Sequence, residues 1–145
     1  MYADANKITE TFLSIERSAN DRWNKGDCTG YFEIYRDDIT YFDSATEKLP
    51  VGRSAVESHI RALYKNPNII RSEYLNPEVA ISDDGNLAVL GYNLRNFIAE
   101  DAGGEKLLTH WNCTEIYRLH DGQWRIAHSH WSFVRNPAII QNATI

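Results

Sequence analysis

The feature that most constrains the fold of this chain is a hairpin pattern within residues 109–133. Two runs rich in β-branched and aromatic residues flank the dipeptide Asp121-Gly122, and Asp-Gly between such runs is a strong short-range indication of a β-hairpin. Alternate residues of a strand point to opposite faces of a sheet. One face of this hairpin must therefore collect aromatic side chains around a few ionisable groups, which is the composition of a small-molecule pocket.

The rest of the chain reads as helices followed by strands, because the apolar period changes from three or four residues to two. We expect three helices, at residues 4 to about 25, 27 to about 35 and 54 to about 64. We expect strands at residues 38–43, 70–82, 86–99, 106–119 and 123–134. This order predicts an α+β fold in which a strongly curved, antiparallel or mixed sheet closes around three N-terminal helices as a cone with a cavity.

Composition excludes several classes of function. The chain has 145 residues, which suits one domain, residues 1–145, with a short C-terminal tail at 135–145. A net charge of -5 without a basic run argues against a nucleic-acid partner. No apolar run is long enough for a membrane span, and no secretory signal opens the chain, so we expect a cytoplasmic protein. Two cysteines, Cys28 and Cys113, imply neither a disulfide framework nor a metal site.

Several segments resemble the nuclear-transport-factor-2-like superfamily, which includes SnoaL-like polyketide cyclases and ketosteroid isomerases. The most specific likeness is to the association domain of calcium/calmodulin-dependent protein kinase II and its free-standing bacterial relatives. The matching segments are ITYFD at 39–43, the helix start at Gly52, Leu75-Asn76-Pro77, the turn at 101–104 and DGQWRIAHSHWS at 121–132. The resemblance implies a cone-shaped, cystatin-like α+β fold that needs no cofactor and forms a homodimer or a higher homo-oligomer. Function does not follow from fold alone.

The resemblance also bears on the pocket. The kinase association domain has arginines in a deep pocket, and one of them falls at or near Arg95. The other two fall at Glu115 and Trp131, so this pocket should suit an anion less well. The family's pocket tyrosine falls at His59, and its strand carboxylate falls at Asp43.

The hairpin loop decides which face is the pocket. A two-residue loop, Asp121-Gly122, would put Glu115 on the face of His128 and His130, whereas a three-residue loop beginning at His120 would shift the register by one. The resemblance favours the three-residue loop. The pocket face then holds Trp111, Cys113, Glu115, Tyr117, Ala127, Ser129 and Trp131. The opposite face then holds His110, Asn112, Thr114, Ile116, Arg118, Trp124, Ile126, His128 and His130.

Three residues are candidates for catalysis. Glu115 would lose water between aromatic rings, so its pKa would rise and it could act as a general acid or base. A structural role, either as an ion pair with Arg125 or Arg95 or as a solvent-facing strand residue, is an equally good interpretation. Asp43 ends a strand beside a loop. In isomerases and cyclases of the superfamily that the chain resembles, an early-strand tyrosine or aspartate often helps to bind or deprotonate the substrate, although turns also favour Asp. His59 lies at the edge of a helix's apolar face, where a half-buried structural histidine is more common than a proton shuttle.

The remaining candidates are binding residues. We expect Arg95 to clamp an anionic group, unless it pairs with a carboxylate. The expected ligand-binding residues are Arg95, Tyr41, Trp111, Tyr117, Ser129 and Trp131. His128 and His130 share a strand face that His110 could join, but no carboxylate or cysteine is placed to complete a metal site, so no metal is expected. A subunit contact formed by Trp124, Ile126, His128 and His130 is the better interpretation of that face.

Together these patterns predict a SnoaL-like domain that binds a small, largely apolar molecule in an aromatic pocket. As an enzyme it would be a cofactor-free isomerase, cyclase or dehydratase that transfers a proton next to a carbonyl, with Glu115 or Asp43 as the base and His59 or Arg95 stabilising the oxyanion. The alternative is a non-enzymatic oligomerisation module that resembles the kinase association domain and needs no ionisable group in the pocket.

Overall fold

The computed structural model describes residues 2–135. The helices are α1 (Tyr2–Asn24), α2 (Thr29–Ile34) and α3 (Arg53–Leu63). The strands are β1 (Tyr35–Phe42), β2 (Ile69–Ile81), β3 (Leu87–Ala99), β4 (Glu105–His120) and β5 (Gln123–Phe133). Every predicted element is present, with bounds that differ by a few residues. The predicted tail lies outside the described residues, apart from Arg135.

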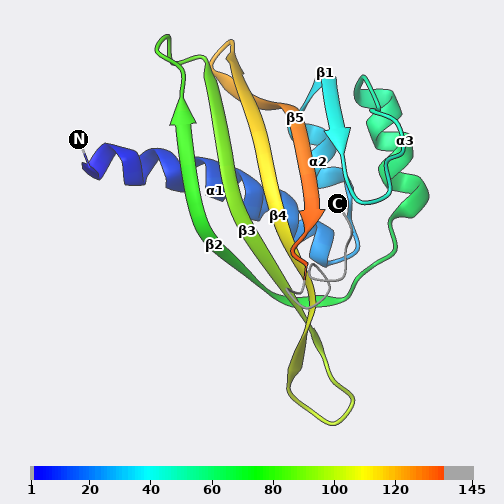
Figure 1. The fold of residues 1–145 in the computed structure, drawn as a ribbon. Helices are drawn as coiled ribbons and strands as arrows, with labels where there is room; N and C mark the ends of the chain where they lie inside the picture. Colours follow the sequence, from blue (N-terminus) through cyan, green and yellow to red (C-terminus); the bar gives the residue numbers. More distant parts are fainter. Residues whose placement is uncertain (1, 136–145) are drawn as a thin grey trace, which may run out of the picture.

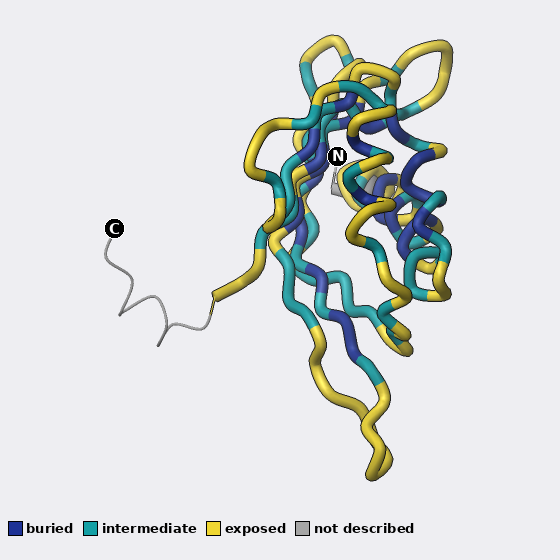
Figure 2. The backbone as a smooth tube through the Cα atoms, turned by 90° about the vertical axis from the view of Figure 1, so that its right-hand side faces the viewer, coloured by how far each residue is buried: buried dark blue, intermediate teal, exposed yellow. Residues whose placement is uncertain are grey.

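The five strands form one mixed sheet in the order β1-β5-β4-β3-β2. β1 runs parallel to β5, and the other neighbours are antiparallel. The three helices cover one face of the sheet, with α1 crossing behind β2, β3 and β4 and α3 lying beside β1 (Figure 1). A view turned by 90° shows the sheet and the helices as two layers with the buried residues between them (Figure 2). The predicted α+β fold is confirmed.

The apolar stripe of α1 faces the sheet and explains why this helix packs there. Phe12 is 1% exposed, and its ring lies 4.9 Å from the ring of Tyr117 on β4 and 5.0 Å from that of Trp124 on β5. Burying a side chain of this size contributes about 2–3 kcal/mol. None of the helices in the described part of the chain is both long and apolar enough to cross a bilayer.

The β4–β5 hairpin has a two-residue loop, so the predicted three-residue loop is wrong. His120 pairs with Gln123, and Asp121 and Gly122 have φ values of 50° and 76°. Two central residues with positive φ are what a tight hairpin turn requires, because the turn must match the right-handed twist of its strands.

The register shift occurs farther along the hairpin, at a β-bulge. Tyr117 pairs with Ile126, whereas Ile116 pairs with His128, so Ala127 is the extra residue on β5. The bulge brings Ser129 opposite Glu115, and the predicted sharing of one face by Glu115, Ser129 and Trp131 is therefore correct.

The position of the bulge also shows that the face predicted for Trp124 and Ile126 was wrong. Before it, Trp124 and Ile126 point inward: Ile126 is fully buried in the core, and Trp124 packs against that core. Their predicted position on the outer face was wrong, because the predicted loop placed the shift before them instead of after them. Ala127, expected in the pocket, is the unpaired residue of the bulge.

Candidate functional site

A cavity of about 160 Å³ lies between the inner face of the sheet and the helices. Its walls come from all three helices and from strands β1, β3, β4 and β5, so elements far apart in the sequence build one site. The lining residues are Asn20, Trp23, Tyr31, Tyr35, Tyr41, Asp43, Ser44, Ile60, Leu63, Tyr64, Leu94, Asn96, Trp111 and Trp131.

Five of the aromatic residues form a continuous wall in which each ring stands nearly at right angles to the next. Tyr64 and Trp23 meet at 74°, with ring centroids 4.6 Å apart, and Trp23 and Tyr31 meet at 79° and 6.0 Å. Tyr31 and Trp131 meet at 83°, and Trp131 and Trp111 at 86°. Edge-to-face packing of this kind is favourable and rigid, so the wall holds its shape.

Asp43 is the charged residue that lines this cavity among the described residues. Its Oδ2 lies 3.0 Å from Nε2 of His59 on α3, and its Oδ1 accepts a 2.8 Å hydrogen bond from the backbone N–H of Ala45. Asp43 thus stabilises the turn and also lines the cavity. The geometry brings together Asp43 and His59, two of the three predicted catalytic residues.

Glu115, the third predicted catalytic residue, does not line the cavity and is fully buried behind its wall. A chain of hydrogen bonds connects it to the wall: the indole N–H of Trp131 donates to Ser129 Oγ at 2.9 Å, and the Ser129 hydroxyl donates to Glu115 Oε1. Glu115 can therefore influence the cavity through the position of Trp131.

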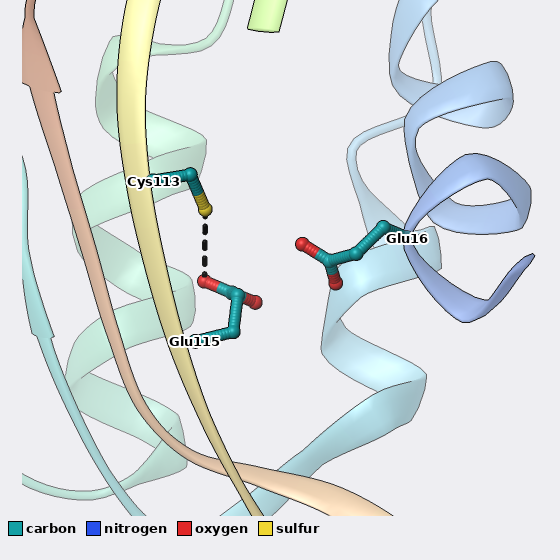
Figure 3. A group of neighbouring side chains, drawn as sticks. All are labelled: Glu16, Cys113 and Glu115. Carbon is teal, nitrogen blue, oxygen red and sulfur yellow. Dashed lines mark hydrogen bonds between the residues drawn. The ribbon is translucent and has the colours of Figure 1, made fainter. Parts of the chain in front are cut away.

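Glu115 faces a second buried acid, Glu16 on α1, with Cys113 beside them (Figure 3). The hydroxyls of Tyr92 and Tyr117 donate to the two Glu16 oxygens at 2.9 and 2.5 Å. The Cys113 thiol donates to Glu115 Oε1 at 3.6 Å, while Oε2 of Glu115 is buried without a hydrogen-bond partner among the described residues.

Burial raises the pKa of Glu16 to about 7, partly offset by the hydrogen bonds from Tyr117 and Tyr92. Burial, and then the charge of Glu16, raise the pKa of Glu115 well above its ordinary value. Two carboxylates in one desolvated site cannot both ionise without strong repulsion. The pair therefore keeps a proton at neutral pH, and the unpartnered Oε2 of Glu115 is the place for it, directed toward Glu16.

Glu16, Cys113 and Glu115 also form the kind of group that can hold a metal ion, since their ligand atoms lie within 4.8 Å of one another. Tyrosine, serine and cysteine groups already donate to three of the four carboxylate oxygens. Hydrogen-bond donors around the carboxylates suit a site that holds a shared proton. A metal ion would need the lone pairs of these oxygens that the donors already use.

Comparison with known proteins places this architecture in a family. Residues 17–136 match the SnoaL-like domain family. The chain belongs to the SnoaL-like domains. No functionally curated protein matches it in sequence.

Solved structures give the same result. A provisionally assigned ketosteroid isomerase from Parabacteroides distasonis ATCC 8503 is 30% identical, with a TM-score of 0.74 over 90% of both chains. The association domain of C. elegans CaMKII is 19% identical, with a TM-score of 0.72 over 89% of this chain and 98% of that one. An NTF2-like protein of unknown function from Pseudomonas putida KT2440 is 21% identical, with a TM-score of 0.71 over 96% and 92%. The last two likenesses show the fold alone.

The predicted binding residues of this SnoaL-like domain divide into two groups. Tyr41, Trp111 and Trp131 line the cavity, whereas Tyr117 and Ser129 are buried behind it. The face predicted for Tyr117 and Ser129 is correct. Their depth is not, because the alternation of a strand gives the face of a residue and not its distance from a cavity.

Arg95 lies on the opposite face of the sheet, so its predicted place in the pocket is wrong. Its neighbours on β3, Leu94 and Asn96, point into the cavity, and a strand alternates its side chains. The Arg95 guanidinium lies 5.4 Å from the centre of the Phe97 ring and 3.6 Å from a Glu73 oxygen. The described lining residues of the cavity therefore include no lysine or arginine.

The sequence reasoning missed the helical contribution to this SnoaL-like domain's site. Trp23 and Tyr31 form the centre of the aromatic wall, and Glu16 opposes Glu115. One indication was available for Glu16: it lies four residues after Phe12 and three before Ala19, so an acid occupies the apolar stripe of the helix. The indication is weak, because many helices carry an acid at the stripe's edge.

Proposed function

We propose that this SnoaL-like domain binds a small molecule in the aromatic cavity and transfers a proton next to its carbonyl group, with Asp43 as the base. The observation that carries the proposal is the hydrogen bond between Asp43 and His59 at the cavity wall. A base must lie within reach of the substrate and be held in place. Asp43 lines the cavity, and its other oxygen is fixed by Ala45.

The proposed step needs no cofactor. Asp43 takes a proton from the carbon next to the carbonyl, the C–H electron pair forms the enolate double bond, and the negative charge moves to the carbonyl oxygen. Return of the proton to another carbon completes an isomerisation. His59 orients the carboxylate by donating to Oδ2, while each Asp43 oxygen keeps a lone pair for the proton.

The hydroxyl of Tyr31 is the group we assign to the developing oxyanion. It lines the cavity, and it is buried without a hydrogen-bond partner among the described residues. Burial raises its pKa well above the ordinary value for tyrosine, so it stays protonated and can donate. A protonated donor with no other partner stabilises developing negative charge strongly in a site that excludes water. This role replaces the one expected of Arg95.

Deuterium exchange tests the proposal without knowledge of the natural substrate. Small ketones incubated with the protein in D₂O should exchange their α-protons, followed by NMR, because proton abstraction is the proposed step itself. Asp43→Asn should abolish the exchange, and Tyr31→Phe should slow it by about 10²–10³-fold, as for loss of one oxyanion donor.

The matched control is Asp37→Asn, which removes a fully exposed carboxylate from β1, the strand that directly precedes Asp43, and should leave exchange unchanged. Exchange that persists in Asp43→Asn would overturn the assignment of the base. The panel must include ketones that are shown to bind the protein. If the wild-type protein exchanges the α-protons of none of them, the catalytic proposal fails.

A second proposal, assembly through the outer face of the sheet, is supported by the likeness to CaMKII association domains and by the residues there. His128 and His130 lie on that face, with the ring of Phe42 6.0 and 5.4 Å from theirs. Ile126 and Trp124 do not contribute, since they point inward. Sedimentation of wild-type protein and of His130→Glu tests this: a variant that keeps the wild-type mass would contradict a contact at His130.

A further inference from the structure

We infer that the ligand of this cavity carries a positively charged nitrogen, as a small amine or quaternary ammonium compound. The inference rests on the proposed function of the cavity and adds the chemical class of its substrate. The arrangement of rings, the sign of the lining charge and the size of the cavity each support it.

The first support is the arrangement of the rings. Seven of the fourteen lining residues are aromatic, and Tyr64, Trp23, Tyr31, Trp131 and Trp111 follow one another at angles of 74° to 86°. These rings come from α1, α2, β4, β5 and the residue after α3, so they line the cavity from several sides. The face of an aromatic ring is negative and attracts a cation, and tryptophan attracts it best. Such a cage is the usual receptor for a methylated ammonium group.

The second support is the sign of the charge. Asp43 is the charged side chain lining the cavity in the described part of the chain. Arg95 lies on the other face of the sheet, beside Glu73 and Phe97. An anionic ligand would therefore meet a carboxylate and no lysine or arginine among the described lining residues, whereas an ammonium group would be paired with that carboxylate.

The third support is the size of the cavity. Its volume of about 160 Å³ is below the roughly 300–1,000 Å³ of sites for drug-sized molecules. A small methylated amine is of a suitable size, and a fused-ring ligand is not.

A cationic nitrogen also suits the proposed reaction. Positive charge close to a carbonyl stabilises the enolate that forms when Asp43 removes the neighbouring proton. The cage would therefore both hold the substrate and make its C–H bond more acidic.

Calorimetric titration of wild-type protein with choline and with 3,3-dimethylbutan-1-ol tests the inference. The two probes share their shape, and the second replaces the ammonium nitrogen by carbon. We expect choline to bind at least about tenfold more tightly, since one desolvated cation–π contact is enough for that ratio. Equal or weaker binding of choline, or no binding of choline at all, overturns the inference.

Two variants locate the bound cation. Asp43→Asn keeps the shape of the side chain and removes its charge, so it should reduce the preference for choline over its neutral analogue. Trp23→Leu should also reduce the preference for choline, because the variant loses one of the aromatic rings that attract the cation. Asp37→Asn, whose carboxylate is fully exposed outside the cavity, should keep the wild-type ratio. A ratio that is the same in all four proteins would place binding elsewhere and overturn the site.

The outcome can be separated from that of the proposed function. If neutral ketones exchange deuterium in an Asp43-dependent manner while choline does not bind preferentially, the ligand class is wrong and the proton-transfer site stands. If choline binds preferentially and no ketone or amino ketone exchanges, the cavity is a receptor for cations and the catalytic proposal fails.

Discussion

The hydroxyl of Tyr117 on β4 donates a 2.5 Å hydrogen bond to Oε2 of Glu16 on α1, across 101 positions of sequence. Tyr92 on β3 donates to the other oxygen of the same carboxylate. A buried acid thus joins the first helix to two strands in the middle of the sheet. Since Glu115 lies opposite, the stability of this junction depends on the charge of the pair.

The charge of Glu16 should make the protein less stable as the pH rises. Its pKa is raised from 4.5 to about 7 in the folded protein, so between these values the folded state binds more protons than the unfolded state. Stability is fully present below pH 4.5 and falls by on the order of 3 kcal/mol as the pH rises through 7. Glu16→Gln should reduce this fall and leave the part that is due to Glu115, whose pKa is also raised by burial, as measured by urea unfolding at a series of pH values.

Glu10→Gln is the control for that experiment, because Glu10 is an exposed acid on the same helix. A hydrogen bond from Arg17, and then its charge, lower the pKa of Glu10, so the substitution should not flatten the fall. If Glu16→Gln keeps the wild-type slope, Glu16 does not titrate in this range.

The effect of substituting Glu115 on the free energy of unfolding should depend strongly on the residue that replaces it. Gln keeps the acceptor for the Ser129 hydroxyl and, like the protonated acid, carries no charge beside Glu16, so Glu115→Gln should change the free energy of unfolding by less than about 1 kcal/mol. Glu115→Ala leaves the Ser129 hydroxyl without its acceptor and opens a cavity, which should cost about 2–5 kcal/mol. Equal losses in the two variants, measured by urea unfolding, would argue against a protonated Glu115.

Trp124 should act as a core residue and not as a subunit contact. Its ring packs against Phe12 at 5.0 Å and 70°. Trp124→Ala should therefore lower the free energy of unfolding by about 3 kcal/mol, whereas His130→Ala, at an exposed position, should change it by no more than about 0.5 kcal/mol. Unfolding measured at two protein concentrations separates a loss of packing from a loss of assembly, because only assembly depends on concentration.

The hairpin turn should tolerate a side chain poorly at Gly122. This residue has a φ of 76°, where a Cβ atom is strained, so Gly122→Ala should cost about 1 kcal/mol. Gly91 on β3 is the matched control: it has an ordinary φ, and a Cβ there would meet nothing within 4 Å. Gly91→Ala should be neutral or stabilising by up to about 1 kcal/mol. Similar thermal unfolding of the two variants would contradict the turn geometry.

Some of the candidate site could be predicted from local pattern. The alternation of β4 gave Glu115 and Trp111 a common inward face, and the likeness at residues 39–43 selected Asp43. Their partners could not be found in this way. Asp43 meets His59 because α3 lies beside β1, and that packing depends on contacts between elements that no local pattern describes.

Arg95 and Trp124 show most clearly why the sequence does not settle which face of the sheet a strand residue occupies. A strand fixes only that neighbours alternate, so an error of one position moves a residue to the opposite face. For Arg95 the error lay in the alignment of a resemblance. For Trp124 it lay in the loop, since the register changed at Ala127, inside the strand. A bulge is stable only when both surrounding faces pack, and packing is a property of the whole sheet.

By itself, the sequence determined the order of helices and strands, the Asp121-Gly122 turn and the aromatic character of the inner face, because propensity, period and turn chemistry act over a few residues. Only the tertiary structure decided which groups meet: Glu16 with Glu115, Asp43 with His59, and five rings around one cavity. The physical reason is that desolvation and charge coupling arise when distant segments exclude water together, and the free energy of that contact belongs to no segment alone.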